Sequence, residues 1–144
     1  MKIQSLLLIF LIFSTFSFSD TSQDELLKRV SFGNSLCEKI TFRTTPERNC
    51  LNDVLARIAK MDIYKMTLEI CSGHNHAVSS ARMVDCFQYA ASRIKWQPLL
   101  DKIELCRYRN STYSAEAICA YQAFLAVHQH CLLYTSPSPR DSCA

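Results

Sequence analysis

A cysteine and two histidines lie close together in the stretch Cys71–His76. One thiolate and two imidazoles would suit zinc. A cysteine that forms a disulfide offers no thiolate, however, and His74 and His76 alone are a poor ligand set. We therefore interpret this stretch as a solvated connection between helices and expect no metal ion.

No group of side chains has the spacing of a catalytic site. Glu69 and Glu104 could pair for acid–base chemistry. Each lies two residues before a cysteine in a similar stretch of sequence, however, so we interpret both more simply as helix surface residues. His128 and His130 are two residues apart, and such positions do not share a helix face. The chain has only two glycines, which excludes a P-loop, a dinucleotide fingerprint and a nucleophile elbow. We expect no catalytic residue, no cofactor and no enzyme activity.

The N-terminal segment has the layout of a secretory signal peptide. Lys2 is followed by the apolar run Leu6–Phe13, and the small residues Ser17 and Ser19 precede the expected cleavage point. The run is too short for a spanning helix, which needs about 18–20 apolar residues. We predict a signal peptide over residues 1–19, a secreted extracellular protein and no membrane span.

The C-terminal segment resembles translated adapter sequence. Cys131–Asp141 matches a transposase adapter of sequencing libraries read in one frame, and the codon before it must end in C, which His130 permits. We interpret residues 131–144 as an artefact. The expected domain is then residues 20–130, truncated at its C-terminal end.

Six cysteines remain once that tail is set aside, and an even number in a secreted chain predicts three disulfides. Alternate cysteines are 33–36 residues apart, a period typical of stacked helical repeats. The six are Cys37, Cys50, Cys71, Cys86, Cys106 and Cys119.

Two pairings of these cysteines fit helices of the expected lengths. One closes the short loops and gives bridges 37–50, 71–86 and 106–119. The other gives 50–71 and 86–106 and leaves Cys37 without a partner. We favour loop pairing because it uses all six.

Apolar residues recur at helical spacing, and no segment alternates as a strand does. Thr45-Pro46, Ser79 and Ser114 are suited to begin helices. We predict an all-α fold of antiparallel helical hairpins, in about three ~34-residue repeats. The expected core is Leu51, Leu55, Ile58, Ile70, Phe87, Ile94, Ile103 and Ile118, with Trp96 between units. Truncation should leave Phe124 and Leu125 exposed.

The remaining signals concern partners. The formal net charge of +3 is too small to indicate nucleic acid. Asn110-Ser-Thr112 is an N-glycosylation sequon. We expect a secreted interaction module that binds an unknown extracellular macromolecule. The alternative is a carrier of a small apolar ligand, and a hydrolase or toxin-like effector is less favoured.

Overall fold

The computed structural model describes residues 20–41, 44–57, 61–73 and 78–133. Over these residues the chain forms six α-helices and no strand, which confirms the all-α prediction. The helices are α2 (Asp20–Ile40), α3 (Thr44–Arg57), α4 (Ile63–Cys71), α5 (Ser80–Ile94), α6 (Gln97–Arg109) and α7 (Tyr113–Leu133). The predicted signal peptide and residues 134–144 lie outside the described residues.

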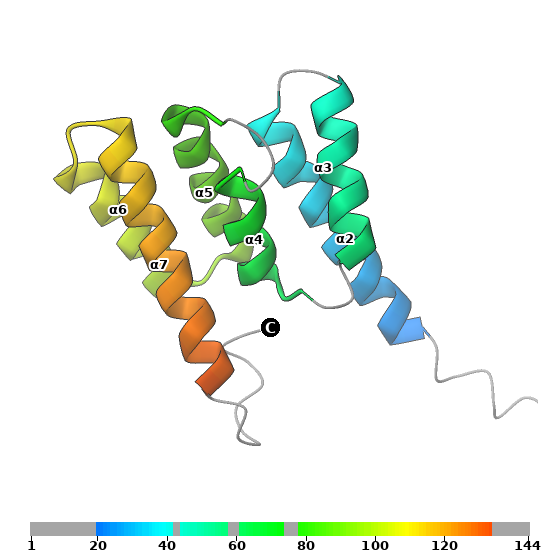
Figure 1. Ribbon diagram of the computed structural model, residues 1–144. Helices are drawn as coiled ribbons and strands as arrows, with labels where there is room; N and C mark the ends of the chain where they lie inside the picture. Colours follow the sequence, from blue (N-terminus) through cyan, green and yellow to red (C-terminus); the bar gives the residue numbers. More distant parts are fainter. Residues whose placement is uncertain (1–19, 42–43, 58–60, 74–77, 134–144) are drawn as a thin grey trace, which may run out of the picture.

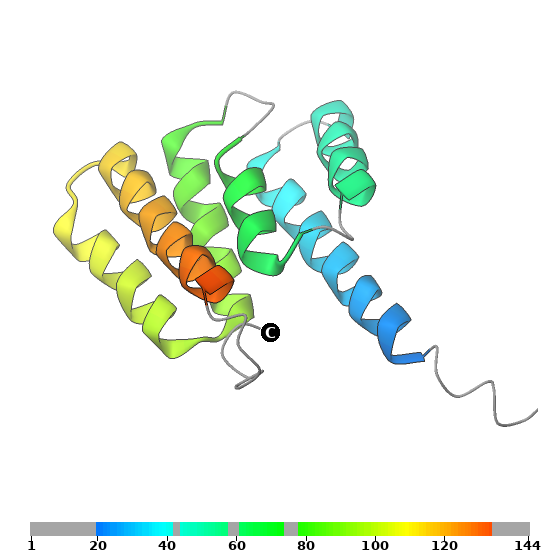
Figure 2. The ribbon, with the colours of Figure 1, turned by 60° about the horizontal axis from the view of Figure 1, so that its bottom comes forward.

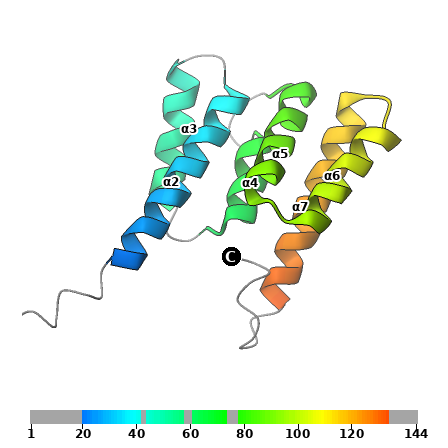
Figure 3. The same ribbon diagram turned by 180° about the vertical axis from the view of Figure 1, so that it is seen from behind.

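Each helix packs beside the next within the pairs α2 and α3, α4 and α5, and α6 and α7 (Figures 1 and 3). The α4 and α5 pair lies in the middle, and α2 and α7 each pack against both of its helices. The outer helices differ, because α6 packs against α5 as well as α7, whereas α3 packs chiefly against α2. The first turns of α2 project away from the other helices (Figure 2). None of the helices in the described ranges is both long and apolar enough to cross a bilayer.

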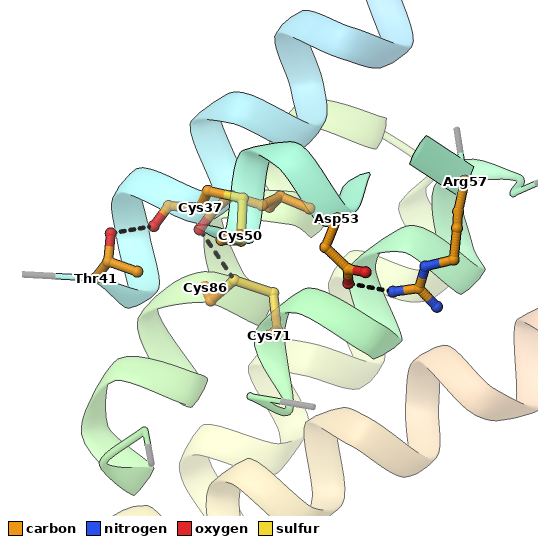
Figure 4. The surroundings of a disulfide bond; sticks show 8 residues. Cys37, Thr41, Cys50, Asp53, Arg57, Cys71 and Cys86 are labelled. Carbon is orange, nitrogen blue, oxygen red and sulfur yellow. Dashed lines mark hydrogen bonds and ion pairs between the residues drawn. A yellow bond between two sulfur atoms is a disulfide. The ribbon is translucent and has the colours of Figure 1, made fainter. Parts of the chain in front are cut away.

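Three disulfides join consecutive helices. Cys37–Cys50 links α2 to α3, Cys71–Cys86 links α4 to α5, and Cys106–Cys119 links α6 to α7. Their Cα–Cα distances are 5.8, 5.4 and 5.6 Å, within the ordinary range for a disulfide. The bridges are therefore those of the loop pairing. Figure 4 shows the first two bridges close together. The Sγ of Cys86 lies 4.0 Å from the carbonyl oxygen of Leu36.

The helices begin near the residues that the sequence indicated. Ser79 is the N-cap of α5, as predicted, with extended backbone angles. α3 begins at Thr44, one residue before the predicted cap Thr45, so Pro46 falls in its first turn. Pro98 occupies the first turn of α6. Proline is tolerated at these places because the first N–H groups of a helix have no partner within it.

One hydrophobic core extends through all six helices. Ile70, Phe87 and Ile103 are buried, as predicted. Leu51 and Ile94 are partly buried, Trp96 packs against the core as expected, and Ile58 lies outside the described residues. At the centre, the Phe87 ring lies 6.3 Å from that of Tyr121 and 5.4 Å from that of Phe124, measured between centroids. These rings join α5 to α7.

Leu55 and Ile118 are exposed, so their assignment to the core was wrong. Leu55 is on α3, where contact chiefly with α2 buries only a narrow stripe that includes Val54. Ile118 faces away from the buried stripe of α7, whose small residues let the helix approach its neighbours.

The expected exposure of Phe124 and Leu125 is also wrong. Phe124 is fully buried and Leu125 is partly buried against the core. The reason is that α7 packs against α4, α5 and α6 at once.

Gly33 lies at a close approach of three helices. A Cβ atom there would be 2.7 Å from the Cγ1 of Val54 and 3.0 Å from the Sδ of Met66. Val54 is buried and β-branched, so its side chain has little freedom to move. We expect Gly33→Ala to lower the free energy of unfolding by about 1–2 kcal/mol, because overpacking exceeds the gain in helix propensity.

Urea unfolding of Gly33→Ala tests this expectation. The matched control is Ser31→Ala, an exposed position two residues away on α2, which should change the unfolding free energy by less than about 0.5 kcal/mol. A stabilised Gly33→Ala variant would show that α2 does not approach α3 and α4 this closely.

Candidate interaction surfaces

The histidines of the suggested metal loop, His74 and His76, lie outside the described residues. Cys71 is bonded to Cys86 and therefore has no thiolate to offer. Within the described ranges, no cluster of three or more His, Cys, Asp or Glu side chains could hold a metal ion.

The two carboxylates considered for acid–base chemistry are not brought together. Glu69 of α4 forms an ion pair with Arg57 of α3, with 2.7 Å between its Oε2 and the Nη1 of Arg57. Arg57 also bonds Asp53 one turn earlier (Figure 4), and this hydrogen bond raises the pKa of Arg57 above its ordinary value. Glu104 is exposed on α6. The Arg57 bridge therefore has a structural role, holding α3 to α4.

His128 has a partner that the sequence did not indicate. Its Nδ1 lies 3.2 Å from the Oδ2 of Asp62, and its side chain is largely buried. Asp62 is the N-cap of α4, and its Oδ1 accepts a hydrogen bond of 2.8 Å from the backbone N–H of Lys65. The pair joins the start of α4 to α7, a contact between residues 66 positions apart that no local pattern predicts.

Four large apolar side chains are exposed on α6 and α7, the two helices that the Cys106–Cys119 bridge joins. Leu105 and Tyr108 of α6 are 45% and 79% exposed, and Tyr113 and Ile118 of α7 are 62% and 61% exposed. We call these four residues, together with the exposed Arg107 and Arg109, the α6–α7 tip. Neither arginine forms an ion pair with another described residue.

The predicted glycosylation site lies in the loop at this tip. Asn110 is the C-cap of α6, and its Nδ2 donates a hydrogen bond of 2.7 Å to the carbonyl oxygen of Cys106. The Oγ1 of Thr112 accepts a hydrogen bond of 3.3 Å from the N–H of Ala115. Thr112 rather than the predicted Ser114 therefore caps α7, which begins at Tyr113. A glycosylated asparagine keeps one amide N–H, so the bond to Cys106 is compatible with modification.

A cleft of about 680 Å³ lies between α2, the start of α4 and the end of α5. Its lining combines apolar side chains, among them Phe32 and Ile94, with charged ones, among them Arg93 and Lys95. We call it the α2–α5 cleft. Its volume is within the range of small-ligand sites.

A second cleft, of about 700 Å³, runs along α5 and is lined mainly by polar side chains. Lys39 of α2 lies on its edge with its Nζ 4.9 Å from the centre of the Tyr89 ring. This cation–π contact occupies the one aromatic ring of the lining. The second cleft therefore offers a ligand less apolar surface than the α2–α5 cleft.

Comparisons with protein-family models, with curated proteins and with solved structures found no match to this chain.

Proposed function

We propose that this protein is a secreted, disulfide-bonded helical module that binds another extracellular macromolecule through the α6–α7 tip. The observation that carries the proposal is the exposure of Leu105, Tyr108, Tyr113 and Ile118 around one bridge. Exposed tyrosines and arginines with apolar neighbours are the side chains that contribute most to binding at protein interfaces.

The chemistry of the tip points to a protein partner with an acidic, partly apolar surface. Arg107 and Arg109 have no ion pair within the described part of the chain, so their charges are available to carboxylates. Arginine pairs with carboxylates in a bidentate geometry. The Cys106–Cys119 bridge holds the two helices together, which reduces the entropy lost on binding.

Secretion is part of the proposal. A signal peptide over residues 1–19 would deliver the chain to an oxidising compartment, where three disulfides form and persist. Asn110 would carry a glycan there, at the loop edge of the tip. The partner would then approach the outer faces of α6 and α7, near Tyr108 and Ile118.

We also propose that the three disulfide-linked helix pairs are copies of one unit of about 34 residues, with a final unit truncated near His130. The 33–36-residue spacing of corresponding cysteines supports this. The placement of each bridge between a helix and the next supports it too. Residues 131–144 would be adapter sequence and no part of the natural chain.

The alternative function, a carrier of a small apolar ligand, is favoured by the volume and partly apolar lining of the α2–α5 cleft. No catalytic step is included in either proposal. The tip and the cleft involve different helices, so each function can be tested separately.

A photocrosslinking residue in place of Tyr108 tests binding at the tip. Irradiated in the secreted fraction of the cells that produce the protein, this variant should give one adduct of defined mass. The matched control carries the same residue at Leu27, which is 65% exposed on α2 and should give no such adduct.

Charge reversal completes the test. Arg107→Glu with Arg109→Glu should reduce the Tyr108 adduct at least tenfold, because two cations that face the acidic partner become repulsive. Arg48→Glu with Lys65→Glu changes the net charge equally at exposed positions on other helices and should leave the adduct unchanged. Equal adducts at positions 108 and 27, or an adduct that survives reversal at the tip, would contradict the proposal.

A further inference from the structure

The α2–α5 cleft has an apolar floor. Phe32 of α2, Ile63 of α4 and Ile94 of α5 line it, and all three are partly buried and packed against the core. Each therefore has its inner side fixed by core packing and its outer side available to a ligand. This floor can take an alkyl chain or a ring.

The charged residues contributed by α2 are already paired. Lys28 forms an ion pair of 2.6 Å with Asp24 on the preceding turn. Arg29 pairs with Glu25, and its Nη1 also donates a 3.5 Å hydrogen bond to the carbonyl oxygen of Met61. The positive charges of Lys28 and Arg29 are thus neutralised by carboxylates on α2 itself.

The carboxylate at the α4 end of the cleft is also occupied. Asp62 uses one oxygen to cap its helix and has the other 3.2 Å from the Nδ1 of His128. Both acidic residues of the lining, Glu25 and Asp62, therefore have partners.

The cations at the end of α5 differ. Arg93 and Lys95 line the cleft, are exposed, and form no ion pair with any other described residue. Lys95 has left-handed backbone angles, with φ of 57°, and its N–H caps α5 by donating 3.0 Å to the carbonyl oxygen of Ala91. Two unpaired positive charges thus lie beside the apolar floor.

We propose that the α2–α5 cleft binds a small anionic amphiphile, with its anionic group at Arg93 and Lys95 and its apolar part on Phe32, Ile63 and Ile94. Guanidinium and ammonium groups form charge-assisted hydrogen bonds with carboxylate, sulfate or phosphate oxygens. The cleft volume of about 680 Å³ is adequate for a ligand of this size.

Calorimetric titration of the full, disulfide-bonded chain tests this with three probes. Sodium octanoate supplies both the charge and the chain, octan-1-ol supplies the chain without the charge, and acetate supplies the charge without the chain. Octanoate should bind saturably, octan-1-ol at least tenfold more weakly, and acetate without measurable heat. Octyl sulfate and octyl phosphate then distinguish the possible anionic groups, and the tightest binder shows which of these groups the cleft prefers.

The variant Arg93→Gln with Lys95→Gly should weaken octanoate binding at least tenfold and leave octan-1-ol binding unchanged. Glycine at position 95 accepts the left-handed backbone angles, so the helix end is preserved. Arg48→Gln with Lys102→Gln removes the same charge from exposed sites outside the cleft and should leave octanoate binding within twofold. Three results would overturn the proposal: equal affinity for octanoate and octan-1-ol, an equal loss of octanoate binding in both double variants, or no saturable binding. None of them would affect the proposal that the α6–α7 tip binds a macromolecule.

Discussion

Complete reduction of the three disulfides is expected to unfold or greatly loosen this protein at moderate temperature. Each bridge joins residues 13 or 15 positions apart, for which the chain-entropy estimate is ~3 kcal/mol per bridge. Three such contributions together are comparable with the total stability of about 5–15 kcal/mol of an ordinary domain. α3 should be lost first, because it packs chiefly against α2.

Thermal unfolding with and without reductant measures this effect. Cys37, Cys71 and Cys86 are fully buried, so reduction has to be verified by alkylation of the thiols. Replacing Cys71 and Cys86 together by alanine should lower the melting temperature less than Cys71→Ala alone, which frees a thiol that can mispair. A melting temperature unchanged after verified reduction would show that the bridges do not stabilise the fold.

Phe87→Ala is expected to lower the free energy of unfolding by about 3–5 kcal/mol. The ring is fully buried on α5 and contacts the rings of Tyr121 and Phe124 on α7. Its removal leaves a cavity between α5 and α7, which pack against each other, and the flanking rings can fill this cavity only in part. The loss of edge-on ring packing adds to the cost.

Urea unfolding of the oxidised protein measures this loss. Ile118→Ala is the matched control, because it also removes a large apolar side chain near this interface but from an exposed position on α7. It should change the unfolding free energy by less than about 0.5 kcal/mol. Similar losses in the two variants would mean that the buried face of α7 has been assigned incorrectly.

The features set by local sequence could be predicted. Helical spacing of apolar residues indicated the all-α class, and Ser79 was correctly placed as a cap. The loop pairing followed from counting, since the competing pairing left Cys37 without a partner. The first two of these inferences depend on residues close together in the chain, and the third depends on the number of cysteines.

The features set by contact between helices that are distant in the sequence could not be predicted. Leu55 and Phe124 both lie on apolar helix faces, and only the packing of α3 and α7 shows that the first is exposed and the second buried. The same holds for the pairing of Asp62 with His128. The α2–α5 cleft combines side chains from three helices, so no motif in the sequence marks it.

The central claim of this account is that each disulfide joins one helix to the next. Experimental mapping of the disulfides tests this claim most directly. Proteolysis without reduction, followed by mass spectrometry of the linked peptides, identifies each pair. The account predicts the bridges Cys37–Cys50, Cys71–Cys86 and Cys106–Cys119. Recovery of peptides linked through Cys50–Cys71 or Cys86–Cys106 would contradict it.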